Sequence, residues 1–210
     1  MDNKENNIVV LGGTFNPLSK AHGYIIKLAA KIVKANKMIL VPTNDKFLYS
    51  WKDFDSNNII PNQVRIKILN EFSKRNMNVE ISRLEMDGIT YKTFDTLTKI
   101  KEENANSNIY FIFGSEKLEE LNKWYRYKEL LRNFNFIIIQ RNEDNIQELL
   151  EKNEYLQEFL LNFTFVEDNK EYAFISSTKI RNAIKNKDIS TMKNLTYNYC
   201  ISILKKEGLL

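Results

Sequence analysis

Short apolar runs alternate with longer stretches of helical periodicity along this chain, and this alternation limits the possible folds more than any other feature. Six runs rich in Val, Ile and Phe have the length of strands and cover residues 7–11, 38–41, 77–82, 108–113, 134–140 and 163–167. In two intervening stretches, apolar residues recur at helical spacing: Tyr24, Ile25, Leu28, Ala29 and Ile32, then Val64, Ile68, Leu69 and Phe72. Strands that alternate with helices predict an α/β fold, a doubly wound, mainly parallel sheet with helices on both faces.

The rest of the chain predicts a simple organisation. The 210 residues contain no linker, internal repeat or Pro/Gly-rich segment, so we expect one domain over residues 1–210. Residues 177–188 and 196–206 predict two helices that close the domain, and residues 43–62, which have no clear period, predict a long active-site loop. In a doubly wound sheet, ligands bind beyond the carboxyl ends of the strands where strand order reverses. We expect the loops after the first and fourth apolar runs to lie there.

The amino-acid composition limits the classes of molecule that the chain is expected to bind. The single cysteine, Cys200, excludes an internal disulfide and a cysteine-pair metal site, which suits a cytoplasmic protein. No apolar run approaches the roughly 20 residues of a membrane span, so we expect no membrane partner. The net charge of +4 favours polyphosphate ligands. No block of Lys and Arg is dense enough for a nucleic-acid-binding arm, so we expect no nucleic acid partner.

The first candidate site is the turn that follows the first apolar run. Gly12 and Gly13 allow a sharp turn, and together with Thr14 and Phe15 they bring backbone N–H groups to the start of a helix. Unpaired N–H groups at a helix N-terminus favour anions, so this turn predicts a phosphate cradle. It lacks the spacing of a dinucleotide fold and the Gly-Lys-Ser/Thr of a P-loop. The structural alternative is a tight turn without a ligand.

Ser19 and the only histidine, His22, lie three residues apart at the mouth of that helix. This spacing puts them on one helical face, where a hydroxyl and an imidazole N–H would both point at one anion. The structural alternative is that Ser19 caps the helix and His22 is a surface or capping residue.

A second candidate site lies near the other end of the chain. Ser176, Ser177 and Thr178 precede a helical stretch, and Arg181 lies about one turn further on. The hydroxyls can satisfy the first N–H groups of the helix while the guanidinium reaches back towards an anion. In isolation the motif is better explained by an ordinary helix cap, because Ser-Ser-Thr caps are common.

Both sites resemble signatures of the nucleotidyltransferase superfamily that contains the nicotinate and nicotinamide mononucleotide adenylyltransferases. Residues 12–17, GGTFNP, match the first signature, and His22 matches the second histidine of its His-x-Gly-His. Ser19 replaces the first histidine, where the phosphopantetheine adenylyltransferases carry threonine, and Ala21 replaces the glycine. Residues 175–181, ISSTKIR, match the second signature, Ile-Ser-Ser-Thr-x-Ile-Arg. The resemblance covers nearly the whole chain and implies a Rossmann-like fold.

The resemblance also implies further binding residues. Thr93, in YKTFDTL, and the pair Trp124 and Tyr125 correspond to acceptor-binding positions, with the indole stacked on a pyridine ring; ordinary packing of a helix end is the alternative for that pair. For ATP, the implied residues are Gly114, Glu116, Arg141 and a lysine of the 43–62 loop, Lys46 or Lys52. Glu116 stands where the family usually has aspartate, and the loop lacks the family's Pro-Pro-His-Lys.

If the resemblance holds, the chain transfers AMP from ATP to nicotinate or nicotinamide mononucleotide and releases pyrophosphate, for NAD biosynthesis. The implied catalytic residues are His22, Ser19 and Arg181, with Mg²⁺ bound through the ATP phosphates and not by a protein metal site. Two alternatives stay open. One is another acceptor or nucleotide, such as phosphopantetheine or cytidylyl transfer; the other is a nucleotide-binding homologue with reduced activity. The sequence leaves the oligomeric state open.

Overall fold

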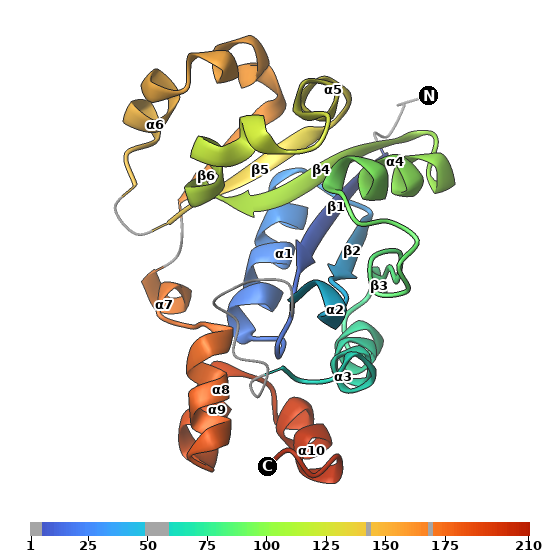
Figure 1. Cartoon of the computed structure of the whole chain (residues 1–210), viewed down its shortest axis with the longest axis vertical. Helices are drawn as coiled ribbons and strands as arrows, with labels where there is room; N and C mark the ends of the chain where they lie inside the picture. Colours follow the sequence, from blue (N-terminus) through green and yellow to red (C-terminus); the bar gives the residue numbers. More distant parts are fainter. Residues whose placement is uncertain (1–5, 49–58, 142–143, 168–169) are drawn as a thin grey trace.

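The computed structural model of the protein describes residues 6–48, 59–141, 144–167 and 170–210 (Figure 1). All six predicted strands are present, as β1 (Asn6–Gly13), β2 (Lys37–Pro42), β3 (Val79–Ile81), β4 (Ser107–Gly114), β5 (Asn135–Gln140) and β6 (Phe163–Glu167). They form one sheet in the order β3-β2-β1-β4-β5-β6, and every neighbouring pair is parallel. The predicted α/β architecture with a parallel sheet is therefore confirmed.

Helices connect the strands and follow the last one. In chain order they are α1 (Lys20–Ile32), α2 (Asp45–Leu48), α3 (Asn62–Lys74), α4 (Thr93–Glu103), α5 (Tyr127–Asn133), α6 (Ile146–Lys152), α7 (Lys170–Ala173), α8 (Ser177–Lys185), α9 (Ile189–Leu195) and α10 (Asn198–Lys206), with the 3₁₀ helices η2 (Ser115–Lys123) and η3 (Glu154–Asn162). No helix within the described ranges is long and apolar enough to cross a membrane.

The sheet is covered on both faces, as the alternation of elements predicts. Along β1, Val9 and Leu11 pack into a core shared with α1, α3, α8, α9 and α10, whereas Ile8 and Val10 pack into a second core shared with α4, α5, α6, η2 and η3. The side-chain period of two in a strand sends alternate residues to opposite faces. Because both faces are buried, β1 reads as a continuous apolar run.

Strand order reverses between β1 and β4, and this reversal positions the candidate site. The two strands are hydrogen-bonded neighbours, with Leu11 opposite Ile112, so the turns that follow Gly13 and Gly114 leave the sheet side by side. The connections from β1 and β4 run in opposite directions from this point, which opens a crevice beyond the carboxyl ends of the strands. The structure confirms that these two loops lie where strand order reverses, as predicted.

Two parts of the chain differ from expectation. The predicted loop over residues 43–62 contains the one-turn helix α2, and its residues 49–58 lie outside the described ranges. The C-terminal part has three helices, because the short α9 lies between the two predicted ones. Asp188 caps α9 by accepting a hydrogen bond from the Thr191 N–H at 3.0 Å, which stabilises a helix too short and polar to show a hydrophobic period. The expectation of a single domain stays a prediction.

Candidate active site

The turn after β1 begins at Thr14, because Gly12 and Gly13 are the last residues of the strand and pair with Val41 and Pro42 of β2. The sharp turn predicted at the two glycines is therefore wrong by two residues. Gly12 lies against the Phe111 ring of β4, which a Cβ at this position would meet at 3.4 Å. Phe15 adopts a left-handed φ of 44° and its side chain is buried, only 1% exposed. A non-glycine residue adopts this conformation only when its surroundings hold it there. The buried aromatic ring therefore anchors the turn, and Thr14 lies at its partly exposed tip.

Ser19 and His22 form a reciprocal cap at the start of α1. The Ser19 hydroxyl accepts a hydrogen bond from the His22 backbone N–H at 3.2 Å, and the Ser19 backbone N–H donates to His22 Nδ1 at 3.1 Å. The hydroxyl also lies 2.8 Å from Nδ1. A backbone N–H can only donate, so Nδ1 is the unprotonated nitrogen and Nε2 carries the proton of the neutral ring. The cap thereby makes His22 an Nε2–H donor.

The orientation of Ser19 differs from the sequence expectation of two groups aimed at one anion. Its side chain is buried, 1% exposed, and its hydroxyl is engaged by the His22 ring and backbone. Ser19 is therefore placed as the cap of α1, which was the structural alternative to a direct contact with an anion. Ala21, which stands for the glycine of the signature, is also buried, so the additional methyl group is accommodated in the core.

Burial keeps His22 neutral. Removal of the ring from water, with a smaller effect from the positive charge of Arg141, lowers the pKa of His22 from 6.5 to about 4. The Phe15 ring packs edge-on against the imidazole, with 5.0 Å between ring centroids. At neutral pH His22 is therefore a neutral hydrogen-bond donor.

This shift has a consequence for stability. Between pH 6.5 and about 4 the unfolded chain binds a proton at this histidine and the folded chain does not, so stability is lost as the pH falls through this window. We expect the melting temperature of the wild-type protein to fall more steeply between about pH 7 and about pH 5 than that of a His22→Asn variant. Carboxyl groups titrate in both proteins, so the difference between the two slopes isolates His22. Equal slopes would contradict a buried neutral imidazole.

The two candidate sites, distant in sequence, meet at the entrance of α1. The Ser177 hydroxyl donates to the Pro17 carbonyl at 2.9 Å, and Arg181 Nη1 donates to the Asn16 carbonyl at 3.0 Å. Arg181 Nη2 also donates to the Thr178 hydroxyl at 2.9 Å, and the half-buried side chain has its pKa lowered by burial. The N-terminus of α8 is thus docked on the segment Asn16–Pro17, between β1 and α1.

Ser176 has a local role in the structure: its hydroxyl accepts the Lys179 N–H at 3.3 Å and caps α8. Ser177 connects the two sites, as described above, and Thr178 is exposed at the same helix end. The three hydroxyls therefore divide into a cap, a link and an exposed group.

The residues after β4 and β5 add charged groups to this edge. The Arg141 backbone N–H donates to the Ser115 hydroxyl at 2.8 Å, and its Nε lies 3.9 Å from a Glu116 oxygen. Glu116 folds back over Gly114, where an added Cβ would lie 2.0 Å from its carboxylate oxygen. A side chain at position 114 would displace the Glu116 carboxylate, which lies at the end of a flexible, exposed side chain. Since Arg141 influences the pKa of His22, the ends of β1, β4 and β5 share one electrostatic environment.

The candidate acceptor residues lie on the α4 and η2 side. Trp124 follows η2 and is half-buried against Phe113 and Phe111, with ring centroids 5.7 Å and 6.4 Å away. Tyr125 is 51% exposed. Thr93 is the first residue of α4 and partly exposed. Aromatic packing thus fixes the indole and leaves Tyr125 at the surface.

Of the two loop lysines, Lys46 lies on α2 and is exposed, and Lys52 lies outside the described residues. The Asn44 side chain accepts the Lys46 N–H at 2.9 Å, and the Asn62 side chain accepts the Asp45 N–H at 3.0 Å. These contacts hold α2 at the start of the loop.

Two charged residues near the site were not predicted, the buried Arg65 and the partly buried Glu85. Arg65 of α3 is fully buried, and its guanidinium contacts the loops after β1 and β2. Glu85 accepts hydrogen bonds from the Thr43 and Thr96 hydroxyls at 3.2 Å and 3.1 Å, and burial raises the pKa of its carboxyl. A signal for Arg65 was present in the sequence, because it lies on the apolar stripe of its helix, three and four residues before Ile68 and Leu69.

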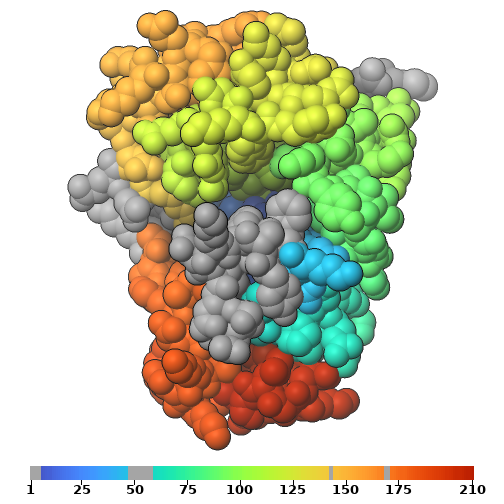
Figure 2. All heavy atoms as spheres, viewed as in Figure 1, coloured from blue at the N-terminus to red at the C-terminus, as the bar shows by residue number. Residues whose placement is uncertain are grey.

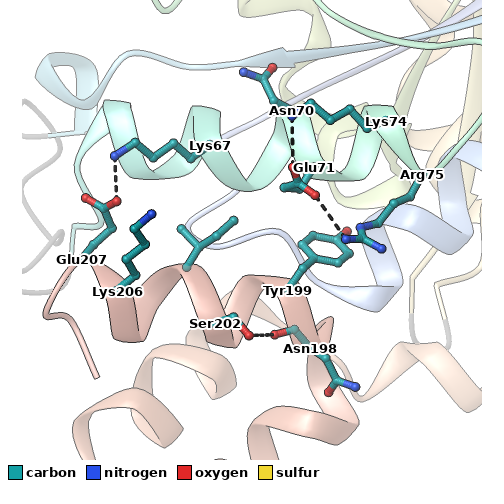
Figure 3. Close-up of a pocket in the computed structure, with 11 residues that line it drawn as sticks. Lys67, Asn70, Glu71, Lys74, Arg75, Asn198, Tyr199, Ser202, Lys206 and Glu207 are labelled. Carbon is teal, nitrogen blue, oxygen red and sulfur yellow. Dashed lines mark hydrogen bonds and ion pairs between the residues drawn. The ribbon is translucent and has the colours of Figure 1, made fainter.

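A separate groove of about 710 Å³ lies between α3 and α10 (Figure 3). Its charged side chains pair with one another: Lys67 with Glu207 at 2.7 Å, and Glu71 with Lys74 at 3.1 Å and Arg75 at 3.3 Å. None of the predicted site residues lines it. At the centre of the face in Figure 2, dark blue atoms from the start of the chain are visible.

Within the described ranges, no group of three or more His, Cys, Asp or Glu side chains is arranged to hold a metal ion. The polar side chains at this edge include hydroxyls, the cations Arg141 and Arg181, and the Glu116 carboxylate beside Arg141. The hydroxyls and the two cations suit an anionic ligand.

Comparisons with known proteins agree with this geometry. The cytidylyltransferase-like family matches residues 10–183. A relative from Fusobacterium nucleatum, named "probable nicotinate-nucleotide adenylyltransferase", is 38% identical over 191 residues, which cover 89% of this chain and 92% of the relative. A relative of the same name from Clostridium acetobutylicum is 30% identical over 202 residues, 95% of this chain and 96% of its own. A solved structure of Plasmodium falciparum nicotinic acid mononucleotide adenylyltransferase complexed with NaAD shares the fold, with a TM-score of 0.76, 21% identity and coverage of 98% of this chain and 97% of that one.

Proposed function

The chain belongs to the cytidylyltransferase-like family, among the nicotinate-nucleotide adenylyltransferases, and from this premise we propose that it transfers AMP from ATP to nicotinate mononucleotide in NAD biosynthesis. Pyrophosphate is the second product. The observation that carries the proposal is the docking of Arg181 on the Asn16 carbonyl, at 3.0 Å. It brings the two signature segments together at the crevice where β1 and β4 separate.

In this reaction the acceptor phosphate attacks the α-phosphorus of ATP in line. A bond forms between an acceptor phosphate oxygen and that phosphorus, and the bond to the pyrophosphate oxygen breaks. The nucleophile is already an anion, so no side chain has to remove a proton. Catalysis then depends on positioning and on donors aimed at the charge that develops on the phosphoryl oxygens.

His22 is the donor that we assign to the α-phosphate. Its pKa of about 4 keeps it neutral at physiological pH, and the Ser19 cap leaves the proton on Nε2. We assign Ser19 to the positioning of this ring, since its hydroxyl is buried against it. In the proposed mechanism Ser19 therefore orients His22 and does not itself contact the phosphate.

The other proposed contacts follow the arrangement of the loops. For ATP we assign a set of backbone, hydroxyl and charged groups: Gly12, Gly13, Thr14, Phe15, Gly114, Glu116, Arg141, Ser176, Ser177, Thr178, Arg181 and Lys46. Lys52, which lies outside the described residues, is the alternative loop lysine. Glu116 would accept hydrogen bonds from ribose hydroxyls, and the cations would hold the triphosphate. For the acceptor we assign Thr93, Trp124 and Tyr125, with the indole of Trp124 stacked on the pyridine ring.

Mg²⁺ is part of this proposal. It would be held through phosphate oxygens and water, since the described residues at the crevice form no carboxylate cage. When bound it neutralises charge on the leaving pyrophosphate. A cytoplasmic location, suggested by the single cysteine, belongs to the same proposal.

The proposal is tested by pyrophosphate release from ATP and Mg²⁺ with three acceptors in parallel: nicotinate mononucleotide, nicotinamide mononucleotide and phosphopantetheine. A reaction without acceptor is the control for ATP hydrolysis. We expect the highest kcat/KM with nicotinate mononucleotide. Turnover with nicotinamide mononucleotide alone would change the proposed acceptor but keep the reaction. Turnover only with phosphopantetheine would contradict the acceptor, and no turnover with all three would contradict the function.

A further inference from the structure

We propose that Arg65 is a positioning residue for nucleotidyl transfer. Its side chain joins the proposed phosphate-binding turn after β1 to both ends of the loop that follows β2. The inference rests on the proposed function. Arg65 does not touch the reacting atoms in this scheme. It acts through the backbone of the turn after β1 and through the placement of α2.

The contacts of the guanidinium carry the inference. Arg65 Nη1 donates to the Thr14 carbonyl, and Nη2 donates to the Thr43 carbonyl at 2.8 Å. Nε donates to the Ile60 carbonyl at 3.1 Å, and Nη2 also donates to the Asn62 side-chain oxygen. One planar group therefore binds segments that lie 51, 22 and 5 residues away in the sequence.

These acceptors lie on both sides of the predicted active-site loop. Thr43 begins the loop, directly after β2, and Ile60 is near its end. Thr43 is also tied to the phosphate turn, because its N–H donates to the Gly13 carbonyl at 3.0 Å. Asn62, held by Arg65, accepts the Asp45 N–H at the start of α2, the helix that carries Lys46. The guanidinium thus fixes the described ends of the loop, at Thr43 and Ile60, relative to the turn.

The contact with Thr14 also orients a donor. In a planar trans peptide the C=O and the following N–H point in opposite directions. Because the Thr14 carbonyl points at the buried guanidinium, the Phe15 N–H points away from that guanidinium. Phe15 has a left-handed φ of 44°, a conformation that surrounding contacts must hold. Arg65 therefore fixes the plane of the Thr14–Phe15 peptide in the turn that we assign to ATP.

The charge of Arg65 is unusual for its position. The side chain is 0% exposed, and the oxygen atoms that accept its hydrogen bonds are neutral carbonyl and amide oxygens. Burial lowers its pKa to about 10, with an opposing effect from Asp45, so the group is a cation at neutral pH. A buried cation is retained where its hydrogen bonds are satisfied, and it adds positive potential beneath a site for polyphosphate.

Lysine cannot reproduce this arrangement. The guanidinium offers donors in several fixed directions from one plane, whereas an ammonium is a single centre that cannot reach all four acceptors. Arg65→Lys therefore separates charge from geometry, and Arg65→Met removes both. Arg75→Met is a matched control, because Arg75 lies at the end of the same helix with its side chain 59% exposed, against Tyr199 (Figure 3).

The test is steady-state kinetics on the purified full chain, at a temperature well below each variant's melting transition, so that all molecules are folded. We expect kcat to fall about 30-fold in Arg65→Met and about 10-fold in Arg65→Lys, as for a donor displaced by about an ångström. Arg75→Met should stay within about twofold of wild type. A loss of stability alone would lower the melting temperature without changing kcat below it.

Folded Arg65→Met or Arg65→Lys with a wild-type kcat would overturn the inference. If Arg65→Met does not fold, Arg65→Lys alone decides by the same criterion. The wild-type assay comes first and tests the proposed function separately. If wild type has no turnover with any acceptor, calorimetric titration of wild type and Arg65→Lys with ATP and Mg²⁺ decides, with weaker binding by the variant expected and equal binding overturning the inference.

Discussion

We expect His22→Ala to lower kcat by about 100- to 1,000-fold, the range for loss of one preorganised donor to a developing oxyanion. His22 is suited to this role because it is neutral, with a pKa of about 4, and because the Ser19 N–H occupies Nδ1 and leaves the proton on Nε2. The effect should fall mainly on kcat, since the hydrogen bond strengthens as charge develops on the phosphoryl oxygen. The measurement is pyrophosphate release at saturating ATP and acceptor.

Ser19→Ala is the matched control for this prediction. It removes the hydroxyl but keeps the backbone N–H that donates to Nδ1, so we expect a loss of activity of less than about tenfold. Loss of the helix cap should cost about 1 kcal/mol of stability, visible as a lower melting temperature. Wild-type activity in His22→Ala would refute the donor role. A loss in Ser19→Ala as large as in His22→Ala would instead indicate that the hydroxyl itself binds phosphate.

The second large effect is expected at Arg181. Replacement by Met should lower kcat/KM for ATP by about 100-fold, because a charge-assisted donor to phosphate is lost from a half-buried position, where solvent screens it less. The structure holds this guanidinium ready through the Asn16 carbonyl at 3.0 Å and the Thr178 hydroxyl at 2.9 Å. Arg181→Lys should keep part of the activity, since it preserves the charge without the planar fork.

Lys179→Met is the control for the Arg181 substitution. Lys179 lies on the same helix and is exposed, with its ammonium on the Phe174 carbonyl at 2.7 Å, so we expect kcat/KM within about twofold of wild type. The KM for the acceptor should change little in Arg181→Met, because the residue is assigned to the triphosphate. Equal losses in both variants would mean a general effect of charge removal from α8 and would contradict the specific role.

Much of the fold could be predicted because its signals are local. The six apolar runs became six strands, and α1 and α3 follow the predicted helical spacing. The first signature segment connects β1 to α1, and the second begins α8 with Ser176 as its cap. The elements that were not predicted, such as α2 and α9, are short, so a hydrophobic period has no room to develop, and they depend on caps such as Asp188.

The candidate site was predicted in part. Phe15 packs against His22 and Arg181 docks on Asn16, so the two signature segments meet, while Lys52 lies outside the described residues. The hydroxyl of Ser19 does not have the predicted orientation towards an anion, because the capping box turns it towards the imidazole of His22. Arg65 was not predicted, since an arginine on an apolar helical stripe indicates burial but does not identify its partners.

The sequence by itself determined the α/β class, the strand positions, the family resemblance and the local cap that sets the proton on His22. These depend on contacts between residues a few positions apart, which residue spacing encodes directly. Only the tertiary structure decided which distant segments meet: Arg181 with Asn16, 165 residues apart, and Arg65 with Thr14, 51 residues apart. Those contacts follow from strand order and from the path of each crossover, which bring together groups whose sequence separation carries no information about their distance.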